Sequence, residues 1–145
     1  QPDLVQRHLT TLEWRVVASP DYLKQHGTPK TAEELDNHRL ILFGDHHAPV
    51  PDINWLAEAG RRPGAPRKAV LEVNSLRAML LSARAGLGIT SIPDYMHADT
   101  EGLVQILGDV KAPKVDVYFV YPEELRNSKR VAVFRDYLLG QLAQR

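Results

Sequence analysis

Apolar and polar residues alternate along the chain in patterns that predict short strands followed by short helices. Residues 12–18 are β-branched and apolar enough for a strand. Ser19, Pro20 and Asp21 then supply a helix N-cap, a first-turn proline and a first-turn acid. We therefore expect a strand that leads directly into a helix ending at Gly27, the residue type that favours the left-handed position after a helix.

A second short helix is predicted to begin at Thr31. Residues 31–34 have the Ser/Thr-x-x-Glu form in which the first and last side chains each accept a backbone amide of the other. Residues 39–43 and 69–73 are apolar runs typical of short buried strands. Residues 44–68 between them are expected to form a long loop, partly packed because it contains several large apolar side chains.

The clearest helical pattern is an apolar stripe at the i, i+3, i+4, i+7 spacing of a core-facing helix, formed by Leu76, Met79, Leu80 and Ala83. Asn74 or Ser75 is the expected cap, and Gly86 the expected end. Residues 87–92 then return as a strand that stops at Pro93, where a backbone donor is lost.

The last third of the chain predicts two strands and a closing helix. Residues 103–107 and 115–121 have strand character, and a helix is expected from Ser128 onward. Its apolar stripe is about three turns long and must pack against something: Val131, Phe134, Leu138 and Leu142. Strands that alternate with helices indicate an α/β fold with a mostly parallel sheet and flanking helices.

Composition narrows the function classes. The 145 residues carry 18 Lys and Arg against 18 Asp and Glu, so the overall positive field that attracts nucleic acid is absent. Without cysteine, disulfides and thiolate catalysis are excluded, which agrees with a cytoplasmic protein. No apolar run is long enough for a membrane span, so no membrane contact is expected. The basic run 61–68 predicts a solvated loop, with an acidic partner or DNA as the alternative.

Candidate binding residues follow from the predicted strand ends. In open α/β sheets, ligands bind beyond the carboxyl ends of the strands, where helix N-termini present free amides. These ends fall at Ser19, at Phe43 and Gly44, at Asn74 and Ser75, and at Pro93. We expect these residues to line one crevice.

Asn74 and Ser75 are the strongest candidates, because they combine polar side chains with the positive end of a helix, which suits a carboxylate. The alternative is that they only cap the helix. Arg15, on the strand before Ser19, is a candidate clamp for an anionic ligand, with an ordinary surface ion pair as the alternative.

The sequence contains no motif that specifically indicates a catalytic, cofactor or metal site. Residues 86–88 contain two glycines but follow a helix, whereas a dinucleotide loop follows a strand. Residues 45–47 and the pair His97 and Asp99 are metal-ligand types without a partner at a recognisable spacing. Neither Gly-x-Ser-x-Gly nor His-Glu-x-x-His occurs. We expect no enzyme activity, no catalytic residues, no cofactor and no bound metal.

Several motifs, in their order and spacing, resemble the LysR-type family of bacterial transcription regulators. The resemblance covers nearly the whole chain and is carried by Val16-Val17-Ala18-Ser19-Pro20-x-Tyr22-Leu23, His26-Gly27-Thr28-Pro29, Leu35-x-x-His38-Arg39-Leu40-Ile41, Val73-Asn74-Ser75, Ala85-Gly86-Leu87-Gly88-Ile89, Ile92-Pro93-x-Tyr95, Val120-Tyr121-Pro122 and Val131-x-x-Phe134-x-x-Tyr137-Leu138.

The resemblance implies a fold and a domain organisation. Members join a winged helix-turn-helix to an effector domain resembling type 2 periplasmic binding proteins, with a ligand cleft between two α/β lobes. This chain is expected to lack the DNA-binding part and the opening elements of the first lobe. Residues 19–116 would form a complete second lobe, and residues 1–18 and 117–145 the hinge strands and a remnant of the first.

The resemblance also implies a function. The chain would sense a small-molecule effector, such as an organic anion, for a regulator that acts as a homo-oligomer and touches DNA through a domain absent here. A solute-binding protein of a transporter, which has the same fold, is the alternative.

Overall fold

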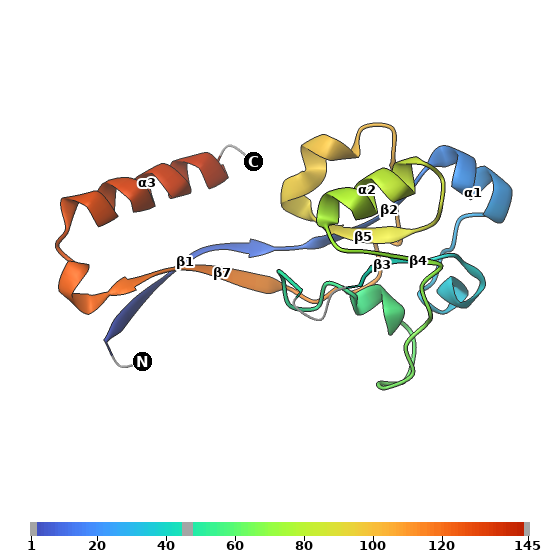
Figure 1. Ribbon diagram of the computed structural model, residues 1–145, viewed down its shortest axis with the longest axis horizontal. Helices are drawn as coiled ribbons and strands as arrows, with labels where there is room; N and C mark the ends of the chain where they lie inside the picture. Colours follow the sequence, from blue (N-terminus) through green and yellow to red (C-terminus); the bar gives the residue numbers. More distant parts are fainter. Residues whose placement is uncertain (1–2, 45–47, 144–145) are drawn as a thin grey trace. The chain divides into compact units, whose positions relative to one another are not determined.

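The computed structural model of the protein describes residues 3–44 and 48–143, which separate into two compact units (Figure 1). The larger unit is residues 13–113. The smaller unit combines residues 1–12 with 114–145. Each unit is therefore described by itself, and the assignment of residues 19–116 to a second lobe stays a prediction.

The smaller unit is built on two long strands. β1 (Leu4–Leu12) pairs antiparallel with β7 (Val115–Pro122), with one register shift between His8 and Thr10. A 3₁₀ turn over Glu123–Leu125 leads into α3 (Lys129–Ala143), which lies along β1 (Figure 1). The predicted closing helix is therefore confirmed.

The apolar stripe of α3 packs less than its sequence pattern indicates. No residue of this helix is buried in the part of the chain that the structure describes. Phe134 is 52% exposed, although its ring lies 5.7 Å from the ring of Phe119 on β7. A two-stranded pair offers one helix too little apolar surface to cover its stripe.

The larger unit contains a mixed sheet. β2 (Trp14–Ala18) lies between β5 (Thr90–Pro93) and β6 (Val104–Ile106), antiparallel to both. β3 (Ile41–Phe43) pairs parallel with β4 (Leu71–Val73). A parallel bridge between Leu40 and Ile89 joins the two sets of strands.

The α/β class is confirmed, with a correction for β2. The pairings give β3, β4, β5 and β6 a common direction, and β2 the opposite one. β5 and β6 are consecutive and joined by a crossover through the 3₁₀ helix Asp94–Thr100, which explains why they run alike. β2 enters between them from the other end, a placement that apolar periodicity cannot reveal.

Two helices cap as their sequences predict. α1 (Pro20–His26) begins at Ser19, whose Oγ accepts the Tyr22 N–H at 3.1 Å, and ends before Gly27 at φ 81°. α2 (Leu76–Arg84) begins at Ser75 and lies against β2, β3 and β5 (Figure 1). Its predicted stripe is buried at Met79, Leu80 and Ala83.

The predicted helix cap at Thr31 is wrong. The chain forms a 3₁₀ helix over Glu33–Asn37 instead, whose N-cap position is Ala32. The Leu35 N–H bonds to the Ala32 carbonyl at 3.1 Å, so the tight turn starts one residue later than a Thr31 cap requires. Glu34 does reach back, but its carboxylate accepts the N–H of Lys30 at 2.7 Å.

The basic run is not wholly a solvated loop, because Arg67 is 7% exposed. Its guanidinium donates to Asp36 Oδ1 at 2.7 Å and to three backbone carbonyls, those of Ala32, Leu56 and Ala59. The hydrogen bond from Arg67 is the main reason that the pKa of Asp36 lies below its ordinary value. Arg67 therefore anchors the long loop after β3, including the 3₁₀ turn Trp55–Ala57, to the body of the unit.

Candidate functional site

The carboxyl ends of three strands meet at one edge of the larger unit, which we call the carboxyl edge. Phe43 and Val73 are register partners at the ends of β3 and β4. The Gly44 N–H donates to the Val73 carbonyl at 2.9 Å, which places Gly44 beside Asn74. β5 runs in the same direction and ends at Pro93. These strand ends therefore lie at one edge, and that they line one crevice stays a prediction.

Asn74 and Ser75 are exposed at this edge and are not enclosed by packing. Ser75 Oγ accepts the Ala78 N–H at 3.0 Å, so it does cap α2. The hydroxyl proton can still be donated to a ligand, since the capping bond uses only a lone pair. Capping and ligand binding by Ser75 are therefore compatible.

Phe43 and Gly44 shape the edge through their backbones. The Phe43 side chain is 6% exposed, and the Asn54 side-chain amide bonds both its N–H, at 2.8 Å, and its carbonyl, at 2.7 Å. At Gly44 an added Cβ would lie 2.9 Å from the Cβ of Glu72. This close approach to Glu72 requires glycine at position 44.

Pro93 and Ser19 lie at opposite ends of the sheet. Pro93 is buried and pairs with Trp14, the first residue of β2. Because β2 runs antiparallel to β5, its carboxyl end places Ser19 at the opposite edge of the sheet. There, Ser19 Oγ lies 3.5 Å from the position that a Cβ on Gly86 would occupy. The prediction that Ser19 shares the crevice is wrong; the side chain is 5% exposed and caps α1.

Arg15 lies one pair away from the carboxyl edge, opposite Ile92 of β5. Its Nη1 donates to Gln105 Oε1 at 2.9 Å, and its buried Nε has no hydrogen-bond partner among residues 3–44 and 48–143. Within those same ranges no ion pair to a carboxylate is formed. The guanidinium thus keeps donor capacity that an anion can use.

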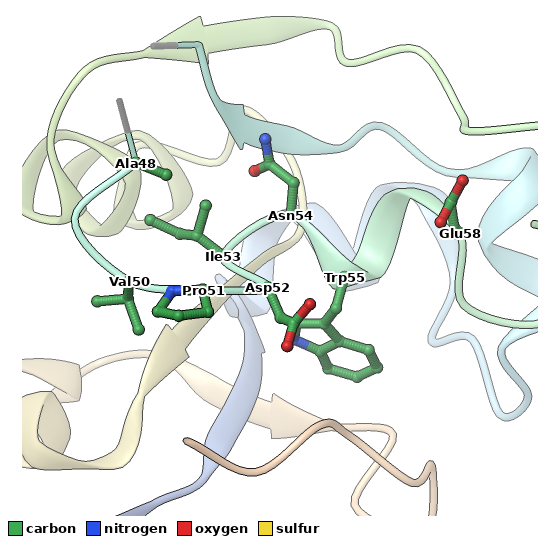
Figure 2. A pocket seen from close by; sticks show the side chains of 8 residues that line it. All are labelled: Ala48, Val50, Pro51, Asp52, Ile53, Asn54, Trp55 and Glu58. Carbon is green, nitrogen blue, oxygen red and sulfur yellow. The ribbon is translucent and has the colours of Figure 1, made fainter. Parts of the chain in front are cut away.

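Two residues of the loop after β3 were not found from sequence. Asn54 holds Phe43, and Trp55 Nε1 donates to Ser91 Oγ on β5 at 2.8 Å, so the loop is attached to two strands of the edge. Figure 2 shows the hollow beside this loop, which has a volume of about 500 Å³ and is lined by Ala48, Val50, Pro51, Asp52, Ile53, Asn54, Trp55 and Glu58. Apolar residues in the loop indicated packing, but no local pattern indicates which distant backbone an Asn will bind.

Metal-ligand candidates were also located. His97 and Asp99 lie in the 3₁₀ helix after β5, and residues 45–47 lie outside the described part of the chain. Residues 3–44 and 48–143 contain no group of three or more His, Cys, Asp or Glu that could hold a metal ion. No helix found in these ranges is long and apolar enough to cross a membrane.

Comparison of sequences finds one family model and several relatives. The model of the LysR substrate binding domain matches residues 1–143. The HTH-type transcriptional regulator CrgA of Neisseria meningitidis is 32% identical over 143 residues, which cover 94% of this chain and 46% of that protein. An HTH-type transcriptional regulator of Haemophilus influenzae is 32% identical over 126 residues, or 82% of this chain and 42% of that protein. The chain thus spans slightly less than half the length of these relatives.

Solved structures agree in fold. The regulatory domain of CrgA from Neisseria meningitidis has a TM-score of 0.74 at 29% identity, covering 97% of this chain and 69% of that one. The regulatory domain of AphB from Vibrio vulnificus has the same TM-score and identity, with 97% and 71% covered.

Proposed function

Because this chain belongs to the LysR substrate-binding domain family, we propose that it is the effector-sensing part of a DNA-binding transcriptional regulator. The relatives named above are regulators, which favours this function over a transporter's solute-binding protein and over an enzyme. DNA would be bound by a part of the regulator other than this chain, the regulator would self-associate, and it would act in the cytoplasm.

The observation that carries the proposal is the exposed polar cluster at the carboxyl edge. Asn74 and Ser75 stand at the N-terminus of α2, where the first-turn amides and the helix dipole favour a negative charge. Gly44 lies at the same edge, and Arg15 offers guanidinium donors next to it. We propose a small organic anion as the effector, held by these groups.

The output of binding is a shift in conformational equilibrium and not a chemical step. An anion that binds one conformation better than another changes their populations by its difference in affinity. The same coupling free energy then changes the affinity of the regulator for its operator DNA.

Ser75→Asp in the full-length regulator tests the anion site directly. Asp caps a helix as well as Ser does, so α2 should stay folded, but its charge repels an anion. We expect effector affinity, measured by calorimetry with a panel of small carboxylates, to fall at least about tenfold, which corresponds to about 1.4 kcal/mol.

Ser128→Asp, at the start of α3, is the matched control and should leave effector affinity unchanged. In Ser75→Asp, but not in Ser128→Asp, the effector should no longer change operator binding, measured by gel mobility. Unchanged carboxylate affinity in a folded Ser75→Asp protein would contradict the proposal.

A further inference from the structure

We infer that the hollow beside residues 48–58 binds a small organic cation, such as a short alkylammonium ion. Its volume of about 500 Å³ falls within the range of roughly 300–1,000 Å³ that is usual for small-molecule sites. Gly44, Asn74 and Ser75 do not line it, so this site is additional to the anion site at the carboxyl edge.

The charged residues that line the hollow have one sign within the described part of the chain. They are Asp52 and Glu58, and both are acids. Glu58 Oε1 accepts the Gly64 N–H at 2.9 Å, which holds this side chain in position. The Asp52 carboxylate is exposed and makes no hydrogen bond or ion pair with the residues that the structure describes. Among residues 3–44 and 48–143, the hollow therefore has negative charge and no cationic lining residue to balance it.

Trp55 adds an aromatic ring that is already fixed in place. The side chain is half-buried against the core, and its Nε1–H is bonded to Ser91 Oγ. In Figure 2 the Asp52 carboxylate and the Trp55 indole lie on the same side of the loop, whereas Asn54 points to the opposite side. A carboxylate beside an indole favours a cation, because the charge attracts it and the π-face of the ring adds a further attraction.

The remaining lining residues suit a short apolar body on that cation. Val50, Pro51 and Ile53 line the hollow, and Ile53 is 5% exposed. An ammonium group at Asp52 would then extend its alkyl chain toward Val50 and Pro51. Inorganic cations lack this apolar part, so an alkylammonium ion should bind better than sodium.

Asp52→Asn is a clean variant for testing this site. Asp52 has a φ of 60°, in the left-handed region, where Asn is among the residue types that fit best. The substitution removes the charge while keeping the shape and backbone of the loop. Glu101→Gln, an exposed acid outside the hollow, is the matched control.

The experiment is an NMR titration of the chain with n-butylammonium chloride, following the two tryptophan indole N–H signals. A Trp14→Phe variant assigns them, since the chain contains two tryptophans. We expect a saturable shift of the Trp55 signal in the millimolar range and none of the Trp14 signal. Asp52→Asn should weaken binding at least about fivefold, as the loss of one charge-assisted contact requires, and Glu101→Gln should not.

Three outcomes would overturn the inference: equal binding in Asp52→Asn, an equal saturable shift with n-butanol, or an equal shift with sodium chloride. Ser75→Asp separates this proposal from the preceding one, because it should weaken carboxylate binding at least about tenfold and leave the Trp55 titration unaffected. If the protein without substitutions binds no carboxylate but still gives the saturable Trp55 shift with n-butylammonium, the anion site alone is refuted.

Discussion

Helices α2 and α3 carry apolar stripes of similar appearance in sequence, yet they differ sharply in the structure. Met79, Leu80 and Ala83 of α2 are at most 1% exposed. On α3, Phe134 of the stripe is 52% exposed, and Val131, Leu138 and Leu142 are only partly buried. The longer helix is therefore the less buried one within its own unit.

The difference lies in what each unit offers its helix. α2 lies against three strands of a sheet whose two faces are lined by large apolar side chains. α3 has β1 and β7, whose pair buries Val5 and Tyr121. An amphipathic stripe predicts a helix and a buried face, but burial itself depends on the layer beneath. The two units should therefore respond very differently to matched substitutions.

The largest effect is expected at the buried cation of the larger unit. Arg67→Met removes the side-chain donor of the Leu56 and Ala59 carbonyls and one of the two donors of the Ala32 carbonyl. It should lower the free energy of unfolding by about 4 kcal/mol. For comparison, Arg126 and Glu123 in the smaller unit form an exposed ion pair. Arg126→Met should cost less than about 0.5 kcal/mol in the same urea titration. Equal costs would show that the bonds of Arg67 contribute nothing beyond a surface pair.

Next in size is truncation of one leucine side chain on each helix. Leu80→Ala removes a side chain that is 1% exposed and should cost about 3 kcal/mol, from lost burial and the cavity that remains. Leu139→Ala on α3, at 41% exposure, should cost less than about 1 kcal/mol. Thermal unfolding followed by circular dichroism measures both, and a larger loss from Leu139→Ala would reverse the comparison.

The smallest effect is a difference in acid response between the units. Burial, followed by the charge of His26, lowers the pKa of His38, whose Nδ1 lies 2.8 Å from the Tyr22 hydroxyl. A lowered pKa means that the unfolded state binds the proton more readily than the folded state. The contribution of His38 to the free energy of unfolding is therefore present above the ordinary pKa of 6.5 and is lost as the pH falls below it.

Asp116 in the smaller unit also contributes stability that is lost as the pH falls, but at a lower pH than His38. Hydrogen bonds from Thr11 and then His8 lower its pKa from the ordinary 3.8, so its contribution is lost only below about pH 4. His38→Asn should remove the stability change between pH 7 and 5 measured by urea titration, and Asp116→Asn should not. An unchanged slope in His38→Asn would exclude His38 as its source.

The candidate site was partly predictable. Asn74 and Ser75 were found because a strand end followed by a capped helix is a local pattern. Gly44 and Pro93 were expected at the same edge from the rule that parallel strands end at one edge. The rule gave the wrong place for Ser19, because β2 runs antiparallel to the other strands and the sequence does not reveal strand direction. Asn54 and Trp55 were missed because their partners, Phe43 and Ser91, are 11 and 36 residues away.

The sequence by itself determined the features that depend on neighbours within a few residues. The Ser19 and Ser75 caps, the helix end at Gly27 and the α2 stripe are of this kind, because capping and helical spacing act over three or four positions. The direction of β2, the burial of Arg67 and the exposure of α3 were decided only by tertiary structure. Each of these depends on which distant strand, carboxylate or sheet face the folded chain brings into contact.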